Sequence, residues 1–240
     1  MKRIMILFVA IIILVAGCAK NKAQMSNENK LALADQLFAA KKYTRAIKLY
    51  EEISYERKSA ATAKAVIRQA EGYFNINKFT DSRLKYTQFT SMFPDHADVA
   101  TAYYRIGVCY YEESLGPQYD QSETSLCIEA LRLFIEKFPS DKRYSEALDY
   151  IRKAQYKLIE KKYYNGYIYY KMHDYSAALM YFQEVVELGN QDKIDKKSLY
   201  YTTLLLIKQG NMTVAESTFN SMKAKYPGAK ETKRLSKYFR

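Results

Sequence analysis

Small residues recur in pairs, twelve positions apart, along this chain of 240 residues. In each pair a turn lies between the first small residue and the second. The pairs are Ala34 and Ala46, Ala70 and Ser82, Gly166 and Ala178, and Thr203 and Ala215. Two antiparallel helices approach closely only where the side chains at the crossing point are small. Each pair therefore predicts the crossing point of one helical hairpin.

Large apolar residues follow the second small residue of each pair at plus four and plus seven. They are Tyr50 and Ile53, Tyr86 and Phe89, Phe182 and Val185, and Phe219 and Met222. This spacing forms a helical stripe that packs against the next hairpin. First small residues are separated by 36 positions (34 to 70) or 37 positions (166 to 203). Such a period is typical of stacked repeats.

A third unit, between the second and the fourth, departs from this spacing. Its small residues are Gly107 and Cys127, 20 positions apart, so eight residues are inserted. The insertion lies within residues 114–124, and Gly116-Pro117 predicts a turn there. Leu131 and Phe134 then occupy the plus-four and plus-seven positions.

Residues 140–171 contain no proline and one glycine, and their apolar residues recur at helical spacing. We expect one long helix there, with Ser140-Asp141 capping its start. The predicted fold is all-α: an α-solenoid of five hairpins resembling tetratricopeptide repeats, with the long helix joining hairpins three and four.

The N-terminus has the features of an export signal. Lys2 and Arg3 precede an apolar run of 13 residues, Ile4 to Ala16, which is too short to span a membrane comfortably. Residues 15–18, Val-Ala-Gly-Cys, resemble the bacterial lipoprotein box, which implies that Cys18 receives a diacylglycerol and becomes the mature N-terminus. The alternative is an ordinary signal peptide that happens to contain a cysteine.

These patterns predict four segments. They are a lipoprotein signal peptide (1–17), a lipidated cysteine with a flexible tether (18–29), repeat units one to three (30–139), and the long helix with units four and five (140–240). An acylated cysteine, with palmitate among its chains, would hold the protein on a membrane. Ala19, rather than aspartate, follows Cys18. An aspartate there would resemble a signal for retention in the inner membrane, so its absence favours the periplasmic face of the outer membrane.

Nearly the whole mature chain resembles the BamD family, the lipoprotein subunits of the outer-membrane β-barrel assembly machine. Residues 119–151 carry the resemblance most specifically. Asp120 lies in the insertion, Phe138-Pro139 ends a helix, and Tyr144 opens the next. The resemblance implies a non-catalytic scaffold that binds the periplasmic repeat domains of the barrel-forming subunit, and the C-terminal segments of unfolded β-barrel clients.

The repeat alignment also predicts a client groove. In stacked hairpins the first helices line a concave surface. The groove positions of the first three units combine aromatic and acidic residues: Asp35, Phe38, Glu71, Phe74, Tyr111 and Glu112. Alternatively, these aromatic residues simply pack between units.

Other functions have less support in the sequence. His96 and His173 are the only histidines and have no companions at metal-ligand or nucleophile spacing, so we expect no enzyme, metal or cofactor. A second candidate is a periplasmic repeat lipoprotein that serves as an adaptor for peptidoglycan enzymes or the Tol–Pal system. Nucleic acid is not an expected partner of an exported protein.

Two further features leave alternatives open. The net charge is +12, and it fits acidic partners, an anionic lipid surface, or simply a lysine-rich composition. Cys109 and Cys127 could form one disulfide, although buried free thiols are favoured.

Overall fold

The computed structural model describes residues 25–239, which form two compact units. Unit 1 extends to Ile76 and unit 2 begins at Asn77. All regular secondary structure in the described part of the chain is helical. Cys18 and the signal peptide lie outside the described residues, so their predicted roles stay predictions.

Unit 1 contains three helices: α2 (Asn27–Ala39), α3 (Tyr43–Ser54) and α4 (Ala60–Asn75). The side chains of Ser26 and Ser59 accept hydrogen bonds from backbone N–H groups at the starts of α2 and α4. Such caps satisfy donors that the first turn leaves free. Helix α3 packs against both α2 and α4. The last three residues of the predicted tether are helical, because α2 begins at Asn27.

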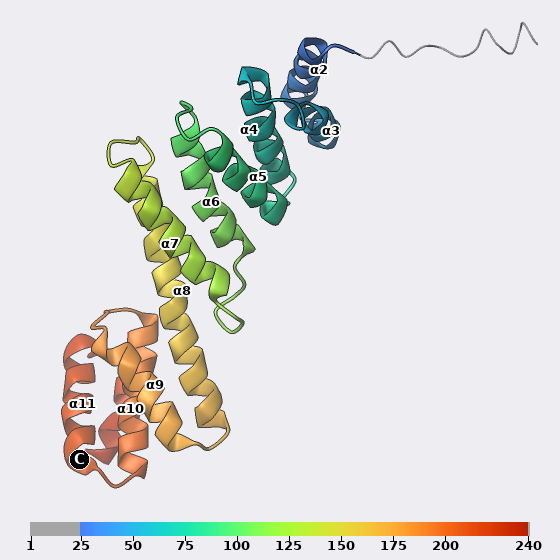
Figure 1. Cartoon of the computed structure of the whole chain (residues 1–240). Coiled ribbons are helices and arrows are strands. Elements are labelled where there is room, and N and C mark those ends of the chain that lie inside the picture. The colour runs from blue at the N-terminus through green and yellow to red at the C-terminus, as the bar shows by residue number, and fades with distance from the viewer. Residues whose placement is uncertain (1–24, 240) are drawn as a thin grey trace, which may run out of the picture. The chain divides into compact units, whose positions relative to one another are not determined.

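Unit 2 contains the remaining helices (Figure 1). They are α5 (Phe79–Met92), α6 (Val99–Glu113), α7 (Ser122–Lys137), α8 (Tyr144–Lys171), α9 (Tyr175–Glu187), α10 (Lys193–Lys208), α11 (Met212–Lys225), α12 (Lys230–Leu235) and a 3-10 turn at Ser236–Tyr238. From α5 to α11, each helix packs against the next along the chain.

The predicted repeat pattern is confirmed by burial. All ten small residues at the expected crossing points are buried. The large residues at plus four and plus seven are buried as well, and most are fully inaccessible. The tightest fit is at Gly107, where an added Cβ would lie 2.5 Å from both Cγ and Cδ2 of Leu131. The all-α class, the long helix α8 and the four hairpins that lie within one unit, α2–α3, α6–α7, α8–α9 and α10–α11, are therefore confirmed. The second hairpin, of α4 and α5, is divided between the two units and stays a prediction.

The turns inside the hairpins share one backbone feature. The residue five positions before the second small residue has a positive φ in four of the five units: Lys41 (58°), Asn77 (58°), His173 (63°) and Gly210 (78°). This left-handed conformation is costly for residues other than glycine. In the third unit, which carries the insertion, the corresponding residue has no positive φ. His173 is thus a turn residue, and the side chain of the neighbouring Asp174 caps the start of α9.

Helix α8 begins where the family resemblance indicated, but the cap predicted at Ser140-Asp141 is wrong. Its first residue is Tyr144, and Ser140-Asp141 does not cap it. Instead, the carboxylate of Asp141 accepts the backbone N–H of Arg143 at 2.8 Å and pairs with its guanidinium at 2.7 Å. These bonds lower the pKa of Asp141 to about 2. The carboxylate is therefore engaged in a turn before the helix and does not reach the N–H groups of its first turn.

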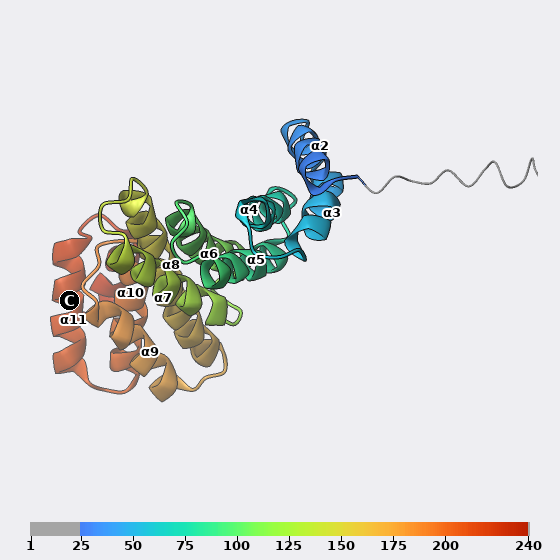
Figure 2. The ribbon, with the colours of Figure 1, turned by 45° about the horizontal axis from the view of Figure 1, so that its top comes forward.

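Helix α8 is long enough to contact helices in both halves of unit 2. Its 28 residues correspond to about 42 Å of helix. Figures 1 and 2 show its first half beside α7 and its second half beside α9.

Candidate binding surfaces

The six residues of the predicted client groove divide between the two units. Asp35 and Phe38 on α2, and Glu71 and Phe74 on α4, belong to unit 1. Tyr111 and Glu112, at the end of α6, belong to unit 2. A single groove through all six residues therefore stays a prediction.

In unit 1 the acidic groove residue Asp35 is already paired. Its carboxylate accepts hydrogen bonds from the Tyr50 hydroxyl at 2.7 Å and from Lys64 Nζ at 2.5 Å. Burial acts to raise the pKa of Asp35, but the hydrogen bonds from Lys64 and Tyr50 outweigh burial and the pKa is lowered. Asp35 is therefore a charged acceptor that ties α2 to α3 and α4.

A second pair lies one turn further along α4. Arg68 Nη1 lies 2.7 Å from Glu71 Oε2, and the Arg68 guanidinium lies 5.2 Å from the centre of the Phe38 ring. Phe38 is half-buried and packs edge-on against Tyr43. Unit 1 thus brings Asp35, Phe38 and Glu71 together in one surface with two cations. Phe74, on the next turn of α4, is partly buried.

Lys64 and Arg68, which balance both acids, were not among the residues predicted from the sequence. Their spacing could have identified them from the sequence, because the two cations are four residues apart on α4 and therefore share a helix face. The unit 1 surface (Asp35, Phe38, Lys64, Arg68 and Glu71) is thus aromatic with matched charges, rather than acidic.

In unit 2, Tyr111 packs between α6 and α8. Its ring lies edge-on to Tyr150 with centroids 5.1 Å apart, and Lys157 Nζ lies 4.7 Å from the ring centre. Lys157 also donates to Ser114 Oγ at 2.6 Å. These contacts favour the packing interpretation for Tyr111. Glu112 remains exposed.

The insertion in the third unit forms an ordered loop between α6 and α7. Gly116 accepts the backbone N–H of Tyr119 at 3.0 Å, and Asp120 accepts that of Ser122 at 2.9 Å. The buried side chain of Gln121 donates to the carbonyl oxygens of Gly116 and Asp120. Lys161, on α8, donates to the Gln118 carbonyl at 3.3 Å. Gly116-Pro117 and Asp120 are therefore loop-shaping residues, with Gln121 at the loop's centre.

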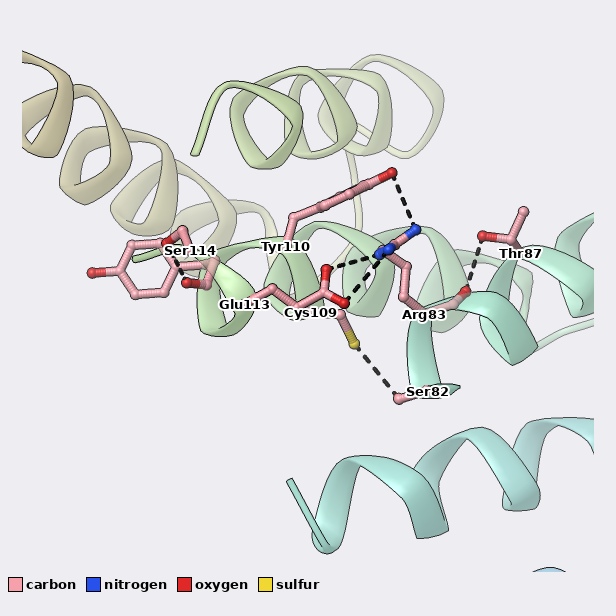
Figure 3. A network of polar contacts seen from close by, with 8 residues as sticks. Ser82, Arg83, Thr87, Cys109, Tyr110, Glu113 and Ser114 are labelled. Atoms are coloured by element: carbon pink, nitrogen blue, oxygen red, sulfur yellow. Dashed lines mark hydrogen bonds and ion pairs between the residues drawn. The ribbon is translucent and has the colours of Figure 1, made fainter. Parts of the chain in front are cut away.

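A polar network joins α5 to α6 (Figure 3). Arg83 Nε donates to Glu113 Oε2 at 2.9 Å, and its guanidinium lies 4.3 Å from the centre of the Tyr110 ring. Beside this network an open cleft of about 600 Å³ is lined by residues of both signs, including Lys78, Asp81 and Glu123. The central charges of this network pair with each other, so the cleft presents no strong net charge.

A smaller cleft of about 380 Å³ lies among α8, α10 and α12, and we name it the tyrosine cleft. It is lined by Tyr163, Tyr164, Tyr167, Lys197, Tyr200, Tyr201, Glu231 and Arg234. This cleft was not predicted from the sequence, because α12 follows the last repeat and has no counterpart in the other units.

Both described cysteines are free, buried thiols, as favoured from the sequence. Burial raises the pKa of Cys109 to about 11 and that of Cys127 to about 12. Within residues 25–239, no cluster of histidine, cysteine and acidic side chains could hold a metal ion. No helix in that range combines the length and the apolar character needed to cross a bilayer.

Stacked helical hairpins with small residues at their crossing points define a tetratricopeptide-type scaffold, and a tetratricopeptide repeat model matches residues 197–229. The model of the outer membrane lipoprotein family YfiO matches residues 24–203, which is most of the chain. The chain belongs to this family of outer membrane lipoproteins.

Two relatives carry the same description, outer membrane protein assembly factor BamD. The protein from Rickettsia prowazekii is 25% identical over 195 residues, covering 81% of this chain and 78% of its own length. The protein from Caulobacter vibrioides is 23% identical over 182 residues, covering 72% of this chain and 59% of its own length. Among solved structures, the TPR2AB domain of yeast Sti1 in its pHSP90 complex is similar at 14% identity and a TM-score of 0.46, covering 86% of this chain and 80% of its own.

Proposed function

We propose that this protein is a non-catalytic lipoprotein subunit of a Bam-type complex, which assembles β-barrel proteins into the outer membrane. The family match over residues 24–203 carries this proposal. The descriptions of both relatives as outer membrane protein assembly factors support it. In this proposal Cys18 is the lipid attachment site, and it holds the repeats at the periplasmic face of the outer membrane.

The helical repeats serve as a scaffold for two kinds of partner. Unfolded β-barrel clients contact unit 1, where Phe38 offers an aromatic side chain between matched charges. The second half of the chain docks the periplasmic repeat domains of the barrel-forming subunit. Exposed apolar and aromatic side chains in α8 and α9, such as Tyr164, Ile168 and Met180, support docking in this half.

Co-purification tests the proposal. The tagged full-length lipoprotein is extracted from native membranes in mild detergent, and its partners are identified by mass spectrometry. We expect to recover a large outer-membrane β-barrel protein with periplasmic repeat domains, in an amount nearly equal to that of the tagged lipoprotein. Recovery of cell-wall hydrolases or Tol–Pal components alone would contradict the proposal and support the adaptor alternative.

Substitution in unit 1 tests the client contact separately. Phe38→Ala together with Phe74→Ala should weaken binding of an unfolded client segment by about tenfold, since each truncation removes aromatic contact area. Tyr55→Ala is a matched control, because this exposed tyrosine also belongs to unit 1. Unchanged client binding in the double variant would show that the groove assignment is wrong.

A further inference from the structure

The last helical segment of unit 2 presents a row of cations, which we name the basic face. Its members lie three or four positions apart on α12 and the 3-10 turn, and all are exposed: Lys230, Lys233, Arg234 and Lys237. Within residues 25–239, no carboxylate pairs with any of the four. Like charges at this spacing share one side of a helix and repel each other. The basic face therefore favours a partner with several negative charges.

The basic face continues into the tyrosine cleft, because Arg234 belongs to both. The cleft adds Lys197, whose Nζ lies 5.5 Å from the centre of the Tyr163 ring. No carboxylate in the described part of the chain pairs with Lys197. Glu231, the one acid in the cleft, lies 3.7 Å from Lys196, which is outside the cleft lining. Two cations of the cleft are thus left without a paired acid.

The other five residues of the cleft are tyrosines, contributed by α8 and α10. Tyr163 and Tyr167 are stacked with centroids 6.3 Å apart, and Tyr167 meets Tyr201 edge-on at 5.9 Å. Burial raises the pKa of Tyr163, and it raises the pKa of Tyr201 to about 12. These phenols therefore keep their protons at neutral pH, and a protonated phenol can donate a hydrogen bond to an anion.

We propose that the tyrosine cleft and the basic face together bind the headgroups of anionic phospholipids at the membrane surface. In the cleft, the headgroup phosphate pairs with Lys197 and Arg234 and accepts hydrogen bonds from the neutral tyrosines. The three lysines of the basic face attract neighbouring anionic headgroups. The cleft volume of about 380 Å³ is at the small end for a ligand site, which suits a single headgroup.

Two observations favour a lipid surface over a small soluble anion. The cations extend beyond the cleft along α12 and the 3-10 turn, so a single bound phosphate would leave most of them unmatched. Tyr238, which is 41% exposed, lies beside Lys237, whose Nζ is 4.9 Å from the centre of its ring. Tyrosine has an apolar body and a polar tip, and it is enriched at membrane–water interfaces.

The inference rests on the proposed function, in which Cys18 carries a lipid and holds the chain on the outer membrane. A lipid anchor and a basic patch strengthen each other, because the anchor makes the second contact intramolecular. The basic face is then a second attachment to the same membrane. Unlike the anchor, which inserts into any bilayer, this attachment depends on the charge of the headgroups.

Lipid binding to the full-length lipoprotein tests the inference. The protein in nonionic detergent is mixed with phosphatidylglycerol or phosphatidylcholine of identical acyl chains, and native mass spectrometry counts the lipids bound to each chain. We expect phosphatidylglycerol to bind about tenfold more tightly, since choline cancels the phosphate charge in the other lipid. This preference should decrease as the salt concentration rises, because salt screens exposed charges.

Variants of the two cleft cations identify the site. Arg234→Gln should weaken binding of phosphatidylglycerol by about fivefold, and adding Lys197→Gln should remove most of the preference for this lipid. Arg132→Gln, at an exposed arginine on α7, is the matched control and should change nothing. Neither Arg234 nor Lys197 pairs with an acid among the described residues, so the variants should fold, and circular dichroism checks this.

Two competitors distinguish a lipid surface from other anionic partners. Inorganic phosphate and a short acidic peptide are each added in excess over phosphatidylglycerol. Neither should displace the lipid, because neither presents a phosphate within an extended charged surface. Displacement by inorganic phosphate would indicate a simple phosphate site, and displacement by the peptide would indicate a protein partner. Either result would overturn the inference.

Two further outcomes would also overturn it: equal binding of the two lipids, and an unchanged preference in the double variant. All of these measurements use the isolated lipoprotein, without a barrel-forming subunit. They therefore leave the co-purification experiment unaffected. Failure of the headgroup site is thus distinguishable from failure of the proposed function.

Discussion

At the scale of single residues, the backbone at Lys41 leads to a stability prediction. Its φ of 58° is unfavourable for lysine and acceptable for glycine, and its side chain is exposed. Lys41→Gly should raise the free energy of unfolding by about 0.5 kcal/mol. Lys42→Gly is the matched control, because Lys42 has a φ of −84°. Glycine there should lower stability by about 0.5–1 kcal/mol, since it only adds flexibility to the unfolded chain.

Urea unfolding followed by circular dichroism measures both variants. The two adjacent substitutions should change the free energy of unfolding in opposite directions. If Lys41→Gly destabilised the protein as much as Lys42→Gly, the left-handed turn would not be a source of strain.

The thiols give a second residue-scale prediction. Cys109 and Cys127 are fully buried, and burial raises the pKa of each well above neutral. The thiolate is the reactive form of cysteine. The native full-length protein should therefore show almost no reaction with a thiol reagent at pH 8. After denaturation, two thiols per chain should react. A count of three after denaturation would mean that Cys18 is not acylated, and rapid native labelling would contradict the packing of the hairpins.

At the scale of elements, the closeness of α6 and α7 depends on Gly107. A Cβ there would lie 2.5 Å from Leu131, so the two helices would have to separate. Gly107→Ala should lower the free energy of unfolding by about 1–3 kcal/mol. Gly228→Ala is the control, since a Cβ at that position meets nothing within 4 Å, and it should change stability by less than about 0.5 kcal/mol.

A double variant tests the cause of that loss. Leu131→Ala removes the atoms that the new Cβ would meet, so it should cost less in the Gly107→Ala background than in the natural chain. The unfolding free energies are measured by urea unfolding. If the losses of the two single variants simply add in the double variant, crowding against Leu131 does not cause the loss in Gly107→Ala.

Most of the fold could be predicted from the sequence, because hairpin crossing points impose a residue size at a regular spacing. Ala34 and Ala46, or Gly166 and Ala178, carry that information locally. The lack of a side-chain cap at the start of α8 could not be predicted, because the Asp141 carboxylate can bond either to the first turn of the helix or to Arg143, and the bond to Arg143 prevails. The tyrosine cleft was also out of reach, because it needs the position of α12 against α10.

At the scale of the whole molecule, the described helices offer several side-chain surfaces, including the tyrosine cleft. The family match associates this scaffold with the outer membrane. The central claim is that the protein is needed for β-barrel proteins to fold into that membrane. In the proposed function the protein affects the yield of folded barrels, and it leaves their synthesis unchanged.

The most direct test is depletion of the protein in the bacterium that encodes it. The abundance of folded β-barrel proteins in the outer membrane is followed by their heat-modifiable migration on gels, and unrelated lipoproteins serve as the control. We predict that folded barrels decline several-fold while the control lipoproteins stay constant, and that the natural chain restores them. Unchanged levels of folded barrels, accompanied by a defect in the cell wall, would contradict the account.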